Sequence, residues 1–86
     1  MFWKPGTNYF IRTVTYHAIG KLVEIDNHEI ILEDAAWVAD SGRWSEALTT
    51  GRLEEVEPFP DGQVAIGRNA VVDACVWSHP LVRGVK

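Results

Sequence analysis

The sequence has little cysteine, little positive charge and no long apolar run, and each shortage excludes a class of protein. A single cysteine, Cys75, rules out an internal disulfide and a structural zinc site built from cysteines. No apolar run approaches the roughly 20 residues that a membrane-spanning helix needs. Eight Lys and Arg residues against twelve Asp and Glu give a net charge of −4, and the basic residues form no cluster of the kind that binds long nucleic acid. We therefore expect no DNA partner and no membrane partner.

The start of the chain and its length suggest a small cytoplasmic protein. The segment MFWKPGTNYF lacks the charged start, apolar centre and cleavage site of a secretory signal. We expect a single domain over residues 1–86, with an N-terminal arm at 1–8 and a C-terminal tail at 78–86. Four tryptophans, three phenylalanines and two tyrosines are more aromatic surface than so small a domain can hide. This excess favours a homo-oligomer or a ligand pocket.

Short β-like segments separated by turn residues dominate the chain. A first strand is predicted over residues 9–19, which alternate in polarity, and Gly20 permits a bend or bulge after it. Segments 21–25 and 29–33 are predicted to pair as a hairpin through Asp26-Asn27-His28, and further strands are expected at 53–59, 63–66 and 70–77. Pro58 places its strand at a sheet edge. We predict a mostly β fold: a strongly bent five- or six-stranded antiparallel sheet resembling a small barrel, with one short helix.

The short helix is predicted near residues 43–50. Trp44, Ala47 and Leu48 share one helical face, and Asp40 or Ser41 is the expected N-cap. So short a helix is not stable alone, so we expect Trp44 and Leu48 to dock on the sheet. Residues 34–40 are compatible with a strand or with a longer helix that starts at Asp34.

Two resemblances to known families bear on the fold and the function. GKLVEIDNHEIILEDA is similar to the first motif of Sm-like RNA-associated proteins, and IGRNAVVDA to their second. That family implies a bent five-stranded sheet that pairs edge to edge into a ring. The stretches IRTVTYH, LEDAAWVADSGRW, EVEPFP and WSHPL resemble small proteins of bacteriophage and prophage genomes. Such proteins are often inhibitors of host defence, including oligomeric sponges that trap nucleotide signals, and they act in the host bacterial cytoplasm.

The residues offer little for catalysis. Cys75 with His17 or His79 is the only combination of nucleophile and base, and a cysteine inside an apolar strand is usually inert. The spacing of the three histidines, including His28, matches no metal-ligand pattern. We therefore expect no catalytic residues, no metal site, no cofactor and no enzymatic activity.

Binding is the better hypothesis. Arginines in exposed positions can contact a phosphate, and aromatic side chains can stack on a base. The candidate ligand-binding residues are Arg12, Tyr16, Trp37, Trp44, Arg68 and Asn69. The leading prediction is a homo-oligomeric binding protein, of the phage-encoded sponge type, that sequesters a nucleotide-derived small molecule without cleaving it. The alternatives are a structural or protein-inhibiting phage component without a small ligand and, last because the chain is acidic, an Sm-like RNA binder.

Overall fold

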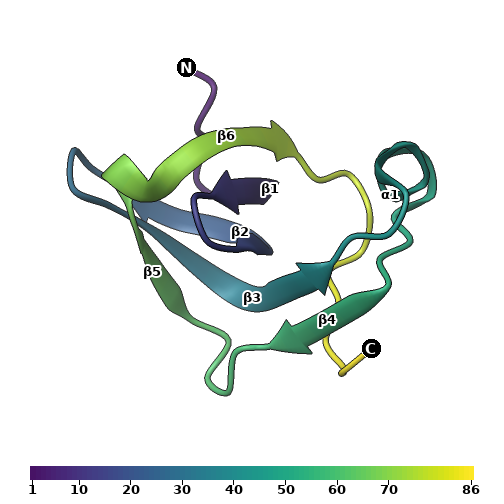
Figure 1. Cartoon of the computed structure of the whole chain (residues 1–86). Coiled ribbons are helices and arrows are strands. Elements are labelled where there is room, and N and C mark those ends of the chain that lie inside the picture. Colours follow the sequence, from purple (N-terminus) through teal and green to yellow (C-terminus); the bar gives the residue numbers. More distant parts are fainter.

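Six antiparallel strands form one sheet in the computed structural model, which describes residues 1–86 (Figure 1). The strands are β1 (Asn8–Thr13), β2 (His17–Ile25), β3 (Glu29–Asp40), β4 (Glu55–Pro58), β5 (Val64–Gly67) and β6 (Val71–Val76). One α-helix, α1 (Trp44–Thr50), follows β3, and the 3₁₀ turn η1 (Arg68–Ala70) joins β5 to β6. The prediction of a mostly β fold with one short helix is confirmed. The strand predicted over residues 9–19 is wrong in its bounds, because the turn at 14–16 divides it into β1 and the start of β2.

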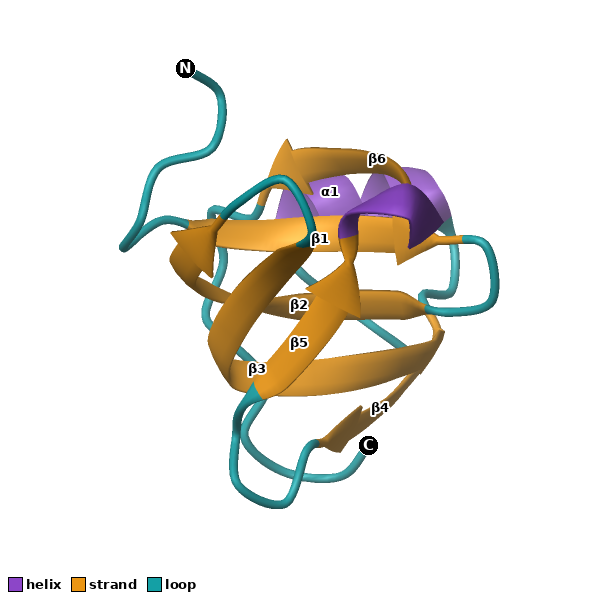
Figure 2. Ribbon diagram, turned by 90° about the vertical axis from the view of Figure 1, so that its left-hand side faces the viewer, coloured by secondary structure: helices purple, strands orange, loops and turns teal.

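The sheet has the strand order β4-β3-β2-β1-β6, and β5 is a second partner of β3. Along one edge of β3, residues 29–32 pair with β5 and residues 36–40 pair with β4. The sheet curls strongly, as Figure 2 shows, but no pairing joins β6 to β4 or β5, so it does not close into a barrel. β4 therefore lies at an edge of the sheet, where Pro58 was predicted to place it.

A β-bulge opposite Gly20 produces part of this bend. Ile19 pairs with Ala36 and Lys21 with Glu33, so Gly20 faces two residues of β3. One of the two is Asp34, whose φ of 49° lies in the left-handed region that aspartate tolerates better than most residues. A Cβ on Gly20 would lie 3.0 Å from the Leu32 Cβ and 3.1 Å from the Ala35 Cβ. The two strands can therefore approach this closely because position 20 has no side chain.

The strands bury apolar side chains on both of their faces. The inner core, inside the curl, consists of Tyr9, Ile11, Ala18, Leu22, Ile30, Leu32, Ala35 and Ile66. The outer core, covered by α1 and the C-terminal tail, consists of Phe10, Ile19, Ala36, Val38, Ala47, Leu53, Val56 and Trp77. Successive residues of a strand point to opposite faces, which explains why neighbours such as Tyr9 and Phe10 enter different cores. β3 lies between the two cores and continues as a strand to Asp40, so residues 34–40 do not form a helix.

Helix α1 forms where it was predicted, within one residue, but a different residue caps it. Its N-cap residue is Arg43, which makes no side-chain capping bond, so the prediction of Asp40 or Ser41 is wrong. The Asp40 carboxylate instead accepts a hydrogen bond from the Gly42 N–H (2.8 Å), which forms a turn before the helix. Ala47 is the residue that α1 buries, while Trp44 and Leu48 remain substantially exposed. Trp44 still contacts the sheet, with its ring centroid 4.8 Å from that of Phe10.

Both ends of the chain pack on the sheet. The Tyr9 hydroxyl accepts a hydrogen bond from the Lys4 N–H (2.7 Å) and donates one to the Phe2 carbonyl (2.8 Å), while Trp3 packs against the inner core. In the tail, the Nε2–H of His79 donates to the Leu48 carbonyl (2.7 Å) at the end of α1. Lys86 exchanges two backbone hydrogen bonds with Val56 (2.9 and 3.2 Å), and the end of the chain thereby occupies the outer edge of β4.

The β2–β3 turn carries a carboxylate, that of Asp26, whose contribution to the stability of the fold depends on pH. Asp26 Oδ1 accepts hydrogen bonds from the backbone N–H groups of His28 (2.7 Å) and Glu29 (2.8 Å), and these bonds lower the pKa of Asp26. Because the pKa of Asp26 is lower in the folded state, the ionised carboxylate stabilises the fold at pH values above its unfolded pKa. This stabilisation is lost as the pH falls through the folded pKa. We expect Asp26→Ala to lower the melting temperature near neutral pH, with a difference that shrinks below about pH 4.

Thermal melts followed by circular dichroism across this pH range test the prediction. Asp61→Ala is the matched control, because Asp61 is an exposed aspartate of another turn that makes no side-chain hydrogen bond. A melting difference for Asp26→Ala that stays constant from acidic to neutral pH would show that the carboxylate charge is not what stabilises this turn.

Candidate functional site

An aromatic pocket opens where β2 begins and β4 ends. Its volume is about 440 Å³, within the range of small-ligand and side-chain pockets. The residues that line this aromatic pocket are Tyr16, Trp37, Glu57, Pro58, Phe59 and Pro60. Tyr16 and Phe59 also pack against the inner core, so the pocket lies over the edge of that core.

Backbone hydrogen bonds and prolines hold the lining in place. Trp37 and Glu57 are direct cross-strand partners of β3 and β4. The Tyr16 N–H donates to Thr13 Oγ1 (3.0 Å), and the Thr13 hydroxyl donates back to the Tyr16 carbonyl (2.7 Å). The Phe59 N–H donates to the Ala35 carbonyl (3.0 Å), between two prolines whose φ angles are fixed by their rings. The pocket is therefore formed before any ligand binds, which reduces the entropy cost of binding.

The charge of the aromatic pocket is negative. Glu57 is its one charged lining residue, and no Lys or Arg takes part. Glu55 lies two residues earlier on β4, on the same face, because Val56 between them points into the outer core. Such a pocket repels phosphate and favours a cation or a neutral apolar group.

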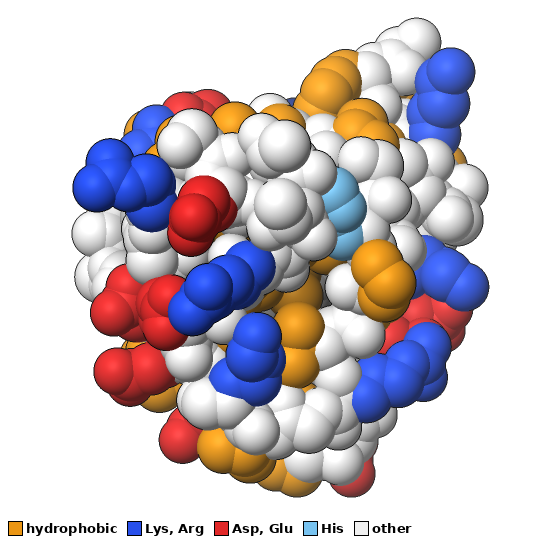
Figure 3. All heavy atoms as spheres, turned by 90° about the vertical axis from the view of Figure 1, so that its right-hand side faces the viewer, with side chains coloured by type: hydrophobic (Ala, Val, Ile, Leu, Met, Phe, Trp, Pro, Cys, Tyr) orange, Lys and Arg blue, Asp and Glu red, His pale blue; other side chains and the backbone are white.

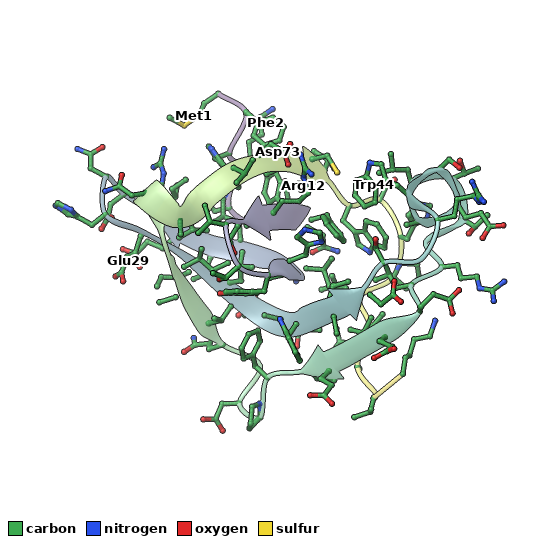
Figure 4. All side chains as sticks on the ribbon, viewed as in Figure 1. Met1, Phe2, Arg12, Glu29, Trp44 and Asp73 are labelled. Atoms are coloured by element: carbon green, nitrogen blue, oxygen red, sulfur yellow. The ribbon has the colours of Figure 1, made fainter.

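A second hollow, the helix groove, lies between α1 and β6. It has a volume of about 450 Å³ and is lined by Phe10, Arg12, Trp44, Leu48, Asp73, Ala74 and Cys75. Figure 4 shows Arg12 and Asp73 side by side, with Trp44 toward α1. Arg12 donates two hydrogen bonds to the Asp73 carboxylate, one of them from Nε at 2.7 Å. This pairing lowers the pKa of Asp73 and leaves the groove without net charge.

The thiol in the helix groove is not activated. Burial, and to a smaller extent the Asp73 charge, raise the pKa of Cys75. The thiol therefore stays protonated at neutral pH, whereas a nucleophilic cysteine needs to be a thiolate. His79 is engaged at the end of α1, and nowhere in the chain do three or more His, Cys, Asp or Glu side chains gather around a possible metal position.

Arg68 and Asn69 lie away from both hollows. Arg68 Nη1 donates to the Asp26 carbonyl (2.6 Å), and the Arg68 N–H donates to the His28 carbonyl (2.9 Å). These bonds fix η1, which contains Asn69, against the β2–β3 turn. A ligand in either hollow is not contacted by these two residues.

The six predicted binding residues are thus divided among three places. Tyr16 and Trp37 meet in the aromatic pocket, while Arg12 and Trp44 meet in the helix groove. The prediction from sequence missed the other half of the aromatic pocket, Glu57 to Pro60. A signal for it exists in EVEPFP, where an aromatic residue between two prolines follows an edge strand.

The side of the molecule that carries α1 shows no basic stripe on its surface. In Figure 3, Lys and Arg side chains are spread over this face with Asp and Glu side chains among them. α1 has seven residues and is too short to cross a lipid bilayer, and no other helix of the chain is long enough to do so.

Comparison with known proteins gives no counterpart: no family model, no curated protein and no solved structure matches the chain. The resemblances to Sm-like proteins and to phage proteins therefore stay predictions.

Proposed function

We propose that this chain is a non-catalytic binding module whose aromatic pocket receives a basic side chain of a partner protein. The observation that carries the proposal is a preformed pocket lined by three aromatic rings and one carboxylate, without any Lys or Arg. The face of a tryptophan attracts an Arg or Lys cation, by about 0.5–2 kcal/mol depending on exposure. A carboxylate adds a charge-assisted hydrogen bond.

The position of the pocket also supports a protein ligand. Trp37 is 39% exposed, so its ring is accessible without rearrangement of the core. Glu55 lies two residues from Glu57 on the same face of β4, so the two carboxylates can pair with successive basic residues of an extended segment. The net charge of −4 attracts a basic partner from a distance.

Acetyl-arginine-amide is a probe small enough to test the pocket without non-specific binding of a polycation. We expect it to shift the indole and backbone NMR signals of Trp37 and the backbone amide signal of Glu57 in a saturable way. Acetyl-glutamate-amide should not shift these signals. Glu57→Gln is expected to weaken this binding about three- to tenfold, the range of an exposed to a partly desolvated ion pair. The chemical shifts of labelled protein during a titration measure both effects.

Glu29→Gln is the matched control, since it removes the same charge at the opposite end of β3, as Figure 4 shows. It should leave the affinity unchanged. If both variants weaken binding equally, the effect comes from net charge alone and the pocket is not the site. If no basic probe shifts Trp37, the proposed function fails.

A nucleotide-derived ligand in the helix groove is the second candidate function. It is favoured by one observation: Arg12 and Trp44 line the same groove, so an anion contact and a stacking surface lie together. A phosphate there has to displace the Asp73 carboxylate from Arg12, and Asp73→Asn should therefore strengthen nucleotide binding. Thermal-shift measurements with a panel of mono-, di- and cyclic nucleotides, on the parent and on Asp73→Asn, test this candidate.

A further inference from the structure

The outer edge of β6 is free over the length of the strand. β6 pairs with β1 alone, and it ends the strand order on that side of the sheet (Figure 2). The Trp77 N–H donates to the Asn8 carbonyl across the β1 ladder. Alternate residues of an antiparallel strand bond to the same neighbour. Ala74 and Val76 lie three residues and one residue before Trp77, so their backbone groups point away from β1. They present unpaired donors and acceptors to another strand.

This edge lacks the protection that the opposite edge has. On β4, Pro58 offers no N–H, Glu55 and Glu57 supply charge, and Lys86 occupies both backbone groups of Val56. β6 reads VVDACV, without Lys or Pro, and the charge of Asp73 is bound to Arg12. The β-bulge at Val72 is its one protective feature.

The side chains of β6 match a second copy of the same strand. Val72 and Val76 are 58% and 51% exposed, and they lie two residues on either side of Ala74. In an antiparallel pairing centred on Ala74, Val72 of one copy faces Val76 of the other, and the reverse contact repeats it. Asp73 then faces Cys75 and not another aspartate, so the pairing brings no like charges into direct opposition.

We propose that two copies of the chain pair through β6 to form a two-fold symmetric dimer with a continuous sheet. This dimer is independent of the aromatic pocket, which belongs to the other edge of the sheet. It removes the unprotected edge, and it covers the two exposed valines of each copy. It also brings two helix grooves to the same interface, since Ala74 and Cys75 line the groove.

Light scattering after size-exclusion chromatography tests the dimer directly. We expect twice the monomer mass of 9.7 kDa for the full chain at micromolar concentration. Val76→Lys and Val72→Lys should each give the monomer mass, because each places a charge in the apolar contact. Val85→Lys is the matched control: Val85 is 76% exposed but lies outside β6, so this variant should remain a dimer.

Amide hydrogen exchange supplies a second measurement that does not depend on a variant. In the dimer, the Ala74 and Val76 amides should exchange at least about tenfold more slowly than in a diluted, monomeric sample. A monomer mass at all concentrations would overturn the proposal. So would a larger ring, a dimer that survives both β6 substitutions, or unprotected Ala74 and Val76 amides.

Discussion

Trp37→Ala is expected to weaken the binding of acetyl-arginine-amide about tenfold or more, while Trp44→Ala leaves it unchanged. The two tryptophans are a matched pair, being 39% and 40% exposed and lying in different hollows. Removal of the Trp37 ring eliminates one wall of the aromatic pocket and the π face that attracts the cation. The backbone amide of Glu57, opposite Trp37 on β4, reports the titration in both variants by NMR.

The same two variants separate the candidate functions. If a nucleotide binds in the helix groove, Trp44→Ala weakens that binding and Trp37→Ala does not, because stacking on Trp44 contributes about 1–3 kcal/mol. Both side chains are partly exposed, so the melting temperature of each variant should show that the fold is intact. Loss of arginine binding in Trp44→Ala alone would refute the assignment to the aromatic pocket.

The sequence predicted those parts of the fold that depend on local backbone chemistry. Asp26 forms its turn because its carboxylate accepts two nearby N–H groups, which is a property of a few consecutive residues. Gly20 indicated a bulge because a glycine inside an apolar strand commonly marks a bulge or a close approach of two backbones. Pro58 indicated a sheet edge because it has no donor for a ladder.

The residue that caps the helix could not be predicted in the same way. Asp40 and Ser41 both have the chemistry of an N-cap, but β3 continues to Asp40 because its pairing with Glu55 of β4 extends that far. That pairing joins residues 15 positions apart, and no local signal reveals it. Long-range contacts thus decided between two locally acceptable structures.

The candidate site was only half predictable for a related reason. Aromatic and arginine side chains could be selected by type, but their grouping depends on which face and which end of the sheet each one occupies. Trp37 shares a pocket with Glu57 because β3 and β4 pair in that register, and Arg12 is bound to Asp73 because β1 and β6 pair. The expected combination of arginine and tryptophan therefore formed once, in the groove where a carboxylate already neutralises the arginine.

Gly20→Ala is expected to destabilise the protein by about 1–3 kcal/mol, the usual cost of adding a methyl group to a filled core. The added Cβ would lie 3.0–3.1 Å from the Cβ atoms of Leu32 and Ala35, both of which are buried and unable to move toward solvent. This cost exceeds the gain of about 0.4–1 kcal/mol that alanine brings by restricting the unfolded chain. For a domain of this size, a loss of about 2 kcal/mol lowers the melting temperature by about 8–16 °C.

Gly67→Ala is the matched control for this prediction. Gly67 also lies in a strand, with φ of −63°, but a Cβ there would meet no atom within 4 Å. Gly67→Ala should therefore leave the stability unchanged or raise it slightly. Ala35→Gly should recover part of the loss when combined with Gly20→Ala, since it removes one of the two clashing Cβ atoms. Equal melting temperatures for Gly20→Ala and Gly67→Ala would show that β2 and β3 can separate at the bulge, and that the close approach at Gly20 is not required.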